Sequence, residues 1–293
     1  MSNQVKKWVY LVVLSLIWGT SFILIKRGLV GFTPVQLGAI RIIIASLVIF
    51  SFGFKRLMEV QKKDVKWISS GAFLGTFFPP FLFALAQTQL DSGITSVFNT
   101  LTPLNTTIVG VLAFGAMINK RQLLGVVIGL LGSIALILAG ETLDPDKSYW
   151  YAIFVYMSSL GYSFNINIIK KHLAHLSPLA ITTASFAVVV LPAFIVLVWS
   201  GFFDLMVGAN PPIASLGYIF LLAVIGTAFA KLYFNKLIQV SSPVFSASVT
   251  YTIPVVAIFW GLWDGEQLQA VQLLGALVVL VGVYLSNKKT PTN

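Results

Sequence analysis

The sequence contains no cysteine and few charged residues. Asp, Glu, Lys and Arg make up 10% of its 293 residues, whereas hydrophobic residues make up 57% and the mean hydropathy is +0.91. The absence of cysteine excludes disulfides, cysteine-ligated metals and thiol catalysis. So small a charged fraction cannot cover the surface of a water-soluble protein of this length. The composition therefore predicts an integral membrane protein that is surrounded by lipid.

Acidic residues and histidine are also scarce, with nine Asp and Glu and two His against 19 Lys and Arg. The acids fall in loops or at the ends of apolar runs, and His172 and His175 lie in a basic loop with no carboxylate or thiol nearby. We therefore expect no catalytic residue, no metal and no cofactor. The net charge of +10 is explained by cytoplasmic loops, so we expect no nucleic-acid partner.

Ten apolar runs are each long enough to cross a bilayer, since a core about 30 Å thick requires roughly 20 helical residues. The first run is longer than a usual signal core, and we expect it to be retained. The predicted fold is all-α and integral to the membrane, with ten transmembrane helices. Their approximate bounds are 8–25, 34–54, 67–87, 93–115, 121–139, 149–168, 178–199, 213–234, 243–263 and 269–286.

The distribution of basic residues predicts the orientation of these helices. If the N-terminus is cytoplasmic, most of the 19 Lys and Arg fall in inner segments and most acids fall outside. Basic residues are enriched in cytoplasmic loops of membrane proteins. We therefore predict a multi-pass protein of the cell membrane, inner or plasma, with both termini in the cytoplasm.

The two halves of the sequence repeat one another. Gln-Leu-Leu-Gly begins at Gln122 and again at Gln272, 150 residues later (272 − 122), and Pro103 of the fourth run corresponds to Pro254 of the ninth. Each half contains five runs, and an odd number makes the second half enter the membrane from the opposite side. The sequence thus predicts two inverted five-helix repeats, residues 1–142 and 143–293.

Several short motifs follow one another along these runs: Trp18-Gly19-Thr20-Ser21-Phe22, Arg41, Pro103, Gly265-Glu266 and both Gln-Leu-Leu-Gly motifs. In these features the chain resembles the drug/metabolite transporter superfamily, in its ten-helix EamA-type branch of metabolite exporters. The resemblance implies a transporter of small metabolites or amino acids. The family often places an acid before the fifth helix, where this chain has Ala116-Met117-Ile118-Asn119. For that reason we expect no transport role for Glu266.

Polar residues recur at helical spacing on the fourth, sixth and ninth runs. Such residues either hold helices together or line a water-filled cavity, and their presence on matching runs favours a cavity. Prolines inside the fourth and ninth runs indicate either a kink or a binding site, whereas Pro79-Pro80 breaks the third run with no counterpart in the eighth. The candidate cavity residues are Trp18, Ser21, Arg41, Asn99, Pro103, Tyr162, Asn165, Thr250, Tyr251 and Pro254.

Two basic residues lie within the apolar runs. Arg41 lies about seven residues, or roughly 10 Å, inside the second run, where it either snorkels or faces an outer vestibule and attracts carboxylate-bearing solutes with Lys26 nearby. Lys231 lies deep in the eighth run and is expected to snorkel. Because no carboxylate falls within a run, we expect a facilitator or exchanger that is not driven by protons.

The predicted function is a secondary transporter that exports small metabolites such as amino acids, by alternating access through a cavity between the repeats. It is expected to act as a monomer or a homodimer on a small-molecule substrate. The alternatives are a membrane channel, or a membrane enzyme or lipid-handling protein with a polar intramembrane site. An enzyme would require a nucleophile, an acid/base pair or a metal cluster within the runs, and none appears.

Overall fold

The computed structural model describes residues 3–115, 148–208 and 211–267, with the isolated positions 124–125, 127–128, 131–132, 270, 274, 277–278 and 280–281. The expected helices 121–139 and 269–286, both Gln-Leu-Leu-Gly motifs, residues 116–119 and the end of the chain lie outside these residues, apart from the isolated positions. The described chain is helical and contains no strand.

Eight segments of the described chain are long and apolar enough to span a membrane, and they coincide with the first four and with the sixth to ninth of the expected runs. The all-α membrane fold is therefore confirmed. The spans are Val5–Leu29, Pro34–Glu59, Lys62–Ala86, Ser92–Phe114, Tyr149–His172, Pro178–Trp199, Ile213–Val240 and Pro243–Trp263.

Several spans consist of more than one helical piece. The first four contain α1 (Asn3–Leu29), α2 (Pro34–Gly53), η1 (Phe54–Glu59), α3 (Lys62–Ala72), η2 (Phe73–Phe77), α4 (Phe78–Ala86), α5 (Ser92–Asn99) and α6 (Thr102–Phe114). The remaining four, with a short connecting helix, contain η3 (Tyr149–Tyr151), α8 (Ala152–His172), α9 (Pro178–Trp199), α10 (Phe202–Val207), α11 (Ile213–Ala223), η4 (Val224–Phe229), α12 (Ala230–Val240), α13 (Pro243–Ala247), η5 (Ser248–Tyr251) and α14 (Ile253–Trp263).

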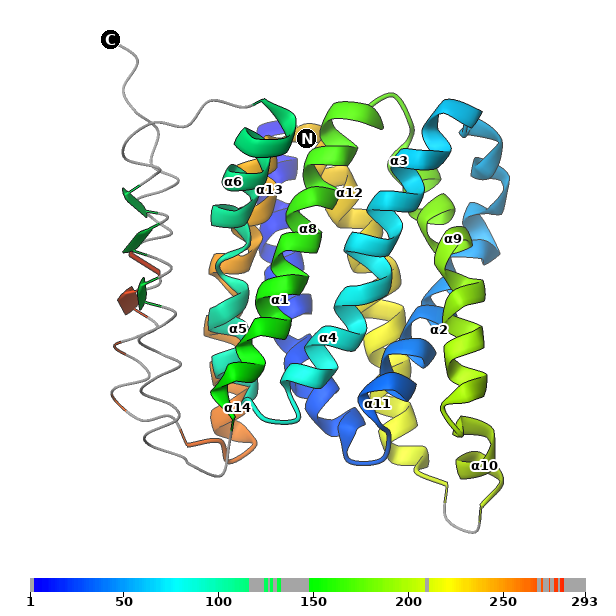
Figure 1. Cartoon of the computed structure of the whole chain (residues 1–293), viewed down its shortest axis with the longest axis vertical. Helices are drawn as coiled ribbons and strands as arrows, with labels where there is room; N and C mark the ends of the chain where they lie inside the picture. The colour runs from blue at the N-terminus through cyan, green and yellow to red at the C-terminus, as the bar shows by residue number, and fades with distance from the viewer. Residues whose placement is uncertain are drawn as a thin grey trace.

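Corresponding spans of the two halves run in opposite directions (Figure 1). The chain passes from α5 at the lower end of the bundle to α6 at the upper end, whereas it passes from α13 at the upper end to α14 at the lower end. Likewise α3 and α4 descend, and α11 and α12 ascend. This is the arrangement that an inverted repeat requires.

The second span of each half begins with the same local chemistry. The side chains of Thr33 and Ser177 cap α2 and α9 by accepting from Gln36 N and Ala180 N, both at 3.2 Å. A proline follows each cap at the first helical position, where its missing N–H has no helical partner to lose. Sequence alone therefore defines the start of these two spans.

Matching spans are also interrupted at matching places. The fourth span breaks between α5 and α6 just before Pro103, and the ninth passes through η5 just before Pro254. The third and eighth spans each contain a π-helical turn, η2 and η4. The expectation that the break beside Pro79-Pro80 has no counterpart is therefore wrong. The eighth span widens without proline, at Gly226-Thr227, which corresponds to Gly75-Thr76.

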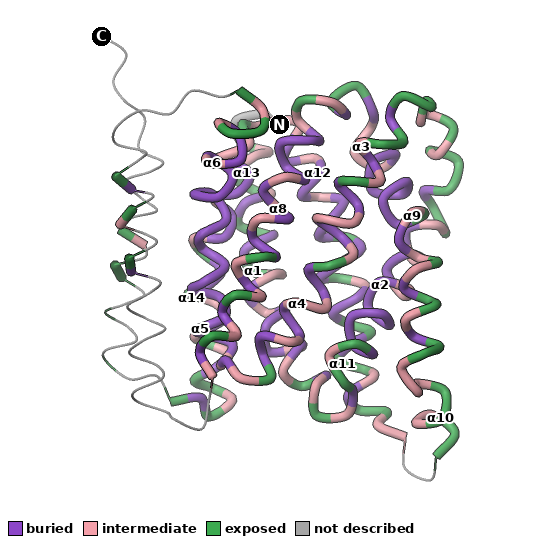
Figure 2. Tube along the Cα trace, in the orientation of Figure 1, coloured by how far each residue is buried: buried purple, intermediate pink, exposed green. Residues whose placement is uncertain are grey.

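Burial separates an inner from an outer surface of the bundle. Figure 2 shows buried residues along the inner faces of the spans and exposed ones on outward faces such as that of α9. The exposed residues of α9 include Leu191, Phe194 and Val198. Large apolar side chains on the outside of a helical bundle are typical of contact with lipid tails. The polar chemistry is consequently concentrated inside.

Candidate functional site

A cavity lies among mid-span residues of both halves. It encloses about 860 Å³ of space, part of it open to solvent. The first half lines it with Trp18, Ser21, Phe22, Ile25, Arg41, Gly75, Thr76, Pro80, Phe83, Asn99 and Thr102, and the second half with Tyr162, Gly226, Thr227, Lys231, Phe234, Ala247, Thr250 and Ile253.

Six of the ten candidate residues lie in the wall of this cavity: Trp18, Ser21, Arg41, Asn99, Tyr162 and Thr250. The other four do not line it. Pro103 and Pro254 lie in the first turn of α6 and α14, just after the interruptions of their spans. Tyr251 packs against the apolar core, and Asn165 accepts a hydrogen bond from the lining residue Lys231. A role of any of the ten in substrate binding stays a prediction.

Tandem prolines create an unusual acceptor in this wall. In an α-helix the carbonyl of Gly75 would accept from N–H of residue 79, and in a π-turn from residue 80. Both residues are proline, which has no N–H, so the helix itself leaves the Gly75 carbonyl free. Lys231 fills this place from the other half, with Nζ 3.0 Å from Gly75 O and 3.1 Å from Asn165 Oδ1.

Lys231 consequently does not snorkel, contrary to the expectation from sequence. Its side chain is buried and bound inside the protein, at 7% exposure. A snorkelling lysine keeps its ammonium at the membrane surface. The reason for the difference is the acceptor at Gly75, because a buried ammonium requires hydrogen-bond partners and this helix provides one.

The π-turn η4 of the second half accepts equivalent hydrogen bonds from residues of the first half. Gly226 O accepts from the indole Nε1 of Trp18 at 3.1 Å, and Thr227 Oγ1 accepts from Nε of Arg41 at 2.5 Å. Each half thus places a cation against the π-turn of the other half. The two halves are joined at the cavity by these polar contacts.

Arg41 is buried in the cavity wall, at 7% exposure, and does not snorkel. Only its Nε has a hydrogen-bond acceptor among the described residues, so the two Nη groups retain donor capacity. The expectation that Lys26 lies beside it is wrong. Lys26 is absent from the cavity wall and pairs with Asp264 at 2.8 Å and Glu266 at 3.0 Å, because both acids directly follow α14, which packs against α1.

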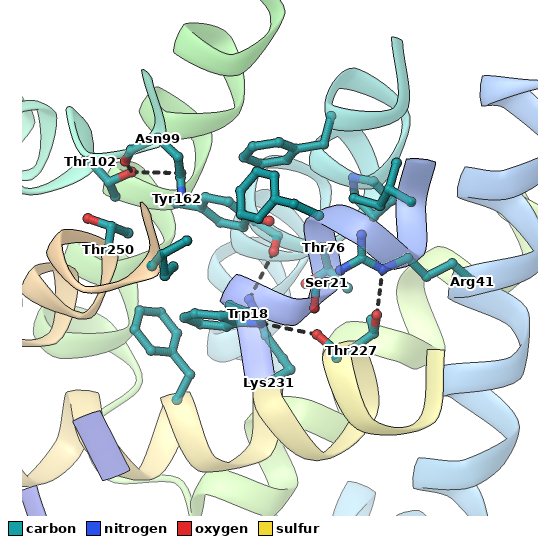
Figure 3. A pocket seen from close by; sticks show the side chains of 18 of the residues that line it. Trp18, Ser21, Arg41, Thr76, Asn99, Thr102, Tyr162, Thr227, Lys231 and Thr250 are labelled. Atoms are coloured by element: carbon teal, nitrogen blue, oxygen red, sulfur yellow. Dashed lines mark hydrogen bonds between the residues drawn. The ribbon is translucent and has the colours of Figure 1, made fainter. Parts of the chain in front are cut away.

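The cavity has two polar sides with aromatic rings between them (Figure 3). Asn99, Thr102 and Thr250 lie on one side, and Arg41, Ser21, Thr76 and Thr227 lie on the other. Thr102 Oγ1 is 3.2 Å from Asn99 Oδ1, whereas the buried Oγ1 of Thr76 has no hydrogen-bond partner in the part of the chain that the structure describes. No Asp or Glu of the described chain lines the cavity.

Sequence reasoning missed Thr76, Thr227 and the role of Lys231. The signal that could have identified them is the repeated pair Gly75-Thr76 and Gly226-Thr227, 151 residues apart (226 − 75), each in the middle of a span. Gly75 also permits a close approach, since a Cβ there would lie 2.5 Å from Cγ of Asn165. Neither pair was recognised because only one of the two is followed by proline.

The loop that follows α8 contains an ion contact that the sequence did not predict. His175 Nε2 lies 3.2 Å from Oδ2 of Asp64, so the statement that no carboxylate is nearby is wrong. Asp64 is 111 residues away along the chain, and α3 and α8 bring the two together. His172 stacks on Trp67 with ring centroids 3.6 Å apart. Within the described chain no three potential metal ligands gather.

A cluster at the lower end of the bundle, the Glu266 junction, joins α1, α5 and α14. It consists of Lys26, Arg27, Asp264, Glu266 and the first backbone N–H groups of α5. Glu266 Oε1 lies 3.0 Å from Lys26 Nζ and accepts from Ser92 N at 3.1 Å, and its Oε2 accepts from Gly93 N at 3.3 Å. Arg27 pairs with Asp264. Glu266 is therefore a buried bridge outside the cavity.

A second cluster at the upper end, the Lys170 junction, joins α8 to α6 and α12. Lys170 Nζ donates to three carbonyls near the end of α12, those of Ile238 at 3.2 Å, Gln239 at 3.2 Å and Ser241 at 2.7 Å. Lys171 Nζ donates to Phe114 O at 3.2 Å. No carboxylate of the described residues pairs with either lysine.

Comparison with known proteins identifies the family. The model of the EamA-like transporter family matches residues 6–138 and again residues 149–288. The chain belongs to the EamA-like transporter family. This EamA-like protein is therefore a membrane protein of a transporter family within the drug/metabolite transporter superfamily, as the motifs predicted.

Relatives of this EamA-like protein extend over almost its whole length. The transporter YoaV of Bacillus subtilis is 23% identical over 97% of both chains, and the inner membrane transporter YedA of Escherichia coli K12 is 25% identical over 93% of this chain and 87% of its own. A protein of Streptantibioticus cattleyicolor named "Probable terminal-alkyne amino-acid exporter" is 21% identical, covering 98% and 95%. A crystal structure with 14% identity has the same fold, with a TM-score of 0.65 over 98% of this chain and 97% of that one.

Proposed function

We propose that this EamA-like protein is a secondary transporter that exports small metabolites such as amino acids by alternating access. The observation that carries the proposal is the cavity, which residues from the middle of spans of both halves enclose. A cavity of this kind between oppositely oriented halves is typical of transporters that expose one site to each side in turn. The relative named as an amino-acid exporter supports the substrate class.

The two repeats are proposed to be residues 1–142 and 143–293, with five transmembrane helices in each. The two family matches, 6–138 and 149–288, support this division. The opposite directions of the described spans support an inverted relation between the repeats. The protein is proposed to act without a cofactor, and not as an enzyme, because the family and its named relatives are transporters.

In the proposed mechanism the repeats rock about the cavity. The paired interruptions at η2 and η4, and those before Pro103 and Pro254, leave short helical pieces that can change angle separately. The contacts from Arg41 to Thr227 and from Lys231 to Gly75 cross between the halves, so they are the bonds that a change of state must rearrange. The gradient of the solute determines the direction of net transport.

Counterflow in proteoliposomes tests this function. Liposomes that contain the full chain are loaded with an unlabelled amino acid, and uptake of the labelled form is followed against empty liposomes and the Trp18→Ala variant. We expect a transient accumulation that persists without a pH gradient. A channel gives no such overshoot, and accumulation driven by an imposed proton gradient and abolished by Lys231→Met would contradict the proposed independence from protons.

The orientation is proposed to place both termini and the Lys170 junction in the cytoplasm of a cell with the protein in its inner or plasma membrane. The basis is the distribution of basic residues. Because the chain has no native cysteine, a single Cys at Asp144 reports the side of that loop cleanly. We expect labelling from outside intact cells, and labelling only after permeabilisation would reverse the orientation.

A further inference from the structure

The cavity contains two buried basic side chains with no countercharge among the described residues. Arg41 and Lys231 are each 7% exposed, and both line the cavity. Neither takes part in an ion pair within the described chain, and none of the described acids lines the cavity. A buried charge in a membrane protein is costly unless a partner compensates it. The missing negative charge therefore points to a ligand.

The same wall has unused hydrogen-bond donors. Both Nη groups of Arg41 lack an acceptor among the described residues, and Lys231 Nζ uses two of its three donors. Thr76 Oγ1 is buried with no hydrogen-bond partner among the described residues, although the corresponding Thr227 binds Arg41. A guanidinium presents two parallel N–H groups that match a carboxylate. These groups together suit an oxyanion.

The remainder of the cavity suits an apolar body rather than an inorganic ion. Trp18 and Phe234 stack edge to face with ring centroids 4.9 Å apart, and Phe22 and Phe83 are 5.8 Å apart in the same manner. All four rings line the cavity. An inorganic anion would leave this aromatic surface in contact with water, whereas an aromatic or branched body would cover it.

We infer that the cavity selects small organic anions, whose carboxylate binds Arg41, Lys231 and Thr76 while an apolar body lies against the aromatic rings. The inference rests on the proposed transport function but departs from its example of amino acids, most of which are zwitterions at neutral pH. Solutes with a net negative charge are bound in preference to zwitterions and amines. An ammonium group in this cavity would stand near two cations with no described carboxylate to compensate it.

Three probes with the same ring isolate the effect of charge: phenylpyruvate, phenylalanine and phenethylamine carry net charges of about −1, 0 and +1 at neutral pH. Binding to the purified full chain is measured by calorimetry, and counterflow is measured with the same probes. We expect the Kd of phenylpyruvate to be at least about tenfold lower than that of phenylalanine, and no binding of phenethylamine. Equal or tighter binding of phenylalanine or phenethylamine would overturn the inference.

Variants of the cavity wall test which residues recognise the anion. Arg41→Gln and Lys231→Met should each weaken phenylpyruvate binding by about tenfold or more and remove the preference over phenylalanine. Arg56→Gln and Lys236→Met are matched controls, because Arg56 lies on η1 directly after α2, Lys236 lies on α12 itself, and neither lines the cavity; they should change neither the affinity nor the preference. An unchanged preference in both cavity variants would refute this assignment.

Thr76→Val provides a test that does not disturb folding. No described residue hydrogen-bonds the Thr76 hydroxyl, so the substitution should leave the thermal midpoint unchanged or raised while it weakens phenylpyruvate binding several-fold. An unaffected Kd would exclude Thr76 from the anion site. Arg41→Lys keeps the charge and should retain the preference for the anion with reduced affinity, since it loses the bidentate fork.

Further probes distinguish a failure of the organic-anion inference from a failure of the proposed transport function. Binding of inorganic phosphate in place of phenylpyruvate or benzoate would contradict an organic substrate, as would the absence of binding by every anion. Counterflow of zwitterions or amines without anions would leave the proposed transporter intact and remove only this inference. Absence of counterflow for all of these solutes would count against the proposed function itself.

Discussion

The two ends of the bundle hold corresponding helices together in different ways. At the Glu266 junction a carboxylate caps α5 from a distant part of the chain, since Asp91 at the N-cap makes no side-chain cap. At the Lys170 end, the corresponding helix α13 is capped locally by Ser242, whose hydroxyl accepts from Phe245 N at 3.2 Å. The N-terminus of α5 is thus capped by a residue from another segment, whereas the N-terminus of α13 is capped by the residue that directly precedes it.

The difference affects the cost of separating the helices at each end. Moving α5 away from Glu266 would leave the first N–H groups of α5 uncapped and disturb the partly buried ion pair of Glu266 with Lys26. Moving α13 away from α8 would leave Ser242 in place as its cap. Opening the Glu266 end should therefore require more free energy than opening the Lys170 end, although the two halves are related by an inverted repeat.

The largest expected effect comes from Glu266→Gln. The substitution removes the charge that compensates Lys26 and favours the N-terminus of α5, and it should lower the free energy of unfolding by about 2–3 kcal/mol. This loss is smaller than that expected for breaking a fully buried ion pair, because Lys26 keeps its ion pair with Asp264. Unfolding in mixed micelles with increasing SDS measures this change.

Glu59→Gln is the control for that substitution. Glu59 pairs with Arg56 at the exposed surface, where water screens an ion pair, and also accepts from Ser177 N at 3.2 Å, so its loss should cost less than that of Glu266. A loss of stability as large as that of Glu266→Gln would show that the difference between the two sites is not one of burial and capping.

A smaller effect is expected from Gly261→Ala, which disturbs the Glu266 junction without removing a charge. A Cβ at position 261 would lie within 2.3 Å of Oε2 of Glu266 and displace that carboxylate. We expect a loss of about 1–3 kcal/mol in the same assay, with little further loss when it is combined with Glu266→Gln. Gly217→Ala is the control, because nothing lies within 4 Å of its Cβ position, and it should be neutral or stabilising. Full additivity would mean that Gly261 acts independently of Glu266.

Lys170→Met should lower the free energy of unfolding by about 1 kcal/mol, less than Glu266→Gln or Gly261→Ala. The ammonium donates to carbonyls at the end of α12, and Met keeps the apolar stem of the side chain while it removes these bonds. Lys171→Met, at an exposed position, should change stability by less than about 0.5 kcal/mol. A loss for Lys170→Met that equals that of Glu266→Gln would remove the asymmetry between the two ends.

Much of the fold was predictable because hydrophobic length, proline and capping residues act locally. The Thr33-Pro34 and Ser177-Pro178 pairs define helix starts, and apolar length defines the spans. The contact of Lys231 with Gly75 was not predictable from a single span. It depends on prolines in one half and a lysine in the other, 156 residues apart, and only the packing of the halves brings them together.

The candidate cavity was predictable to a similar extent and for the same reason. Polar residues in the middle of spans, such as Trp18, Arg41 and Asn99, were identified because an intramembrane polar group requires an explanation within its own helix. The bridging role of Glu266 was not predictable, because its partners include the backbone N–H groups of Ser92 and Gly93, and backbone groups leave no signature in the sequence.

The smallest effect concerns acid sensitivity at the Glu266 junction. Asp264 directly follows the ninth span, and burial there raises the pKa of its carboxyl, but the hydrogen bond from Lys26 and the charges of Lys26 and Arg27 outweigh burial and hold the pKa below its usual value. A carboxyl whose folded-state pKa is lowered contributes stability above its unfolded pKa, near 4, and loses it as the pH falls through the folded value. The difference in stability between the wild type and Asp264→Asn should thus stay constant from about pH 7 to 5 and shrink below about pH 4. A difference that disappears between pH 7 and 5 would instead indicate a raised pKa of Asp264. The ion pair of Asp264 with Lys26 would then be too weak to make the Glu266 end of the bundle harder to open than the Lys170 end.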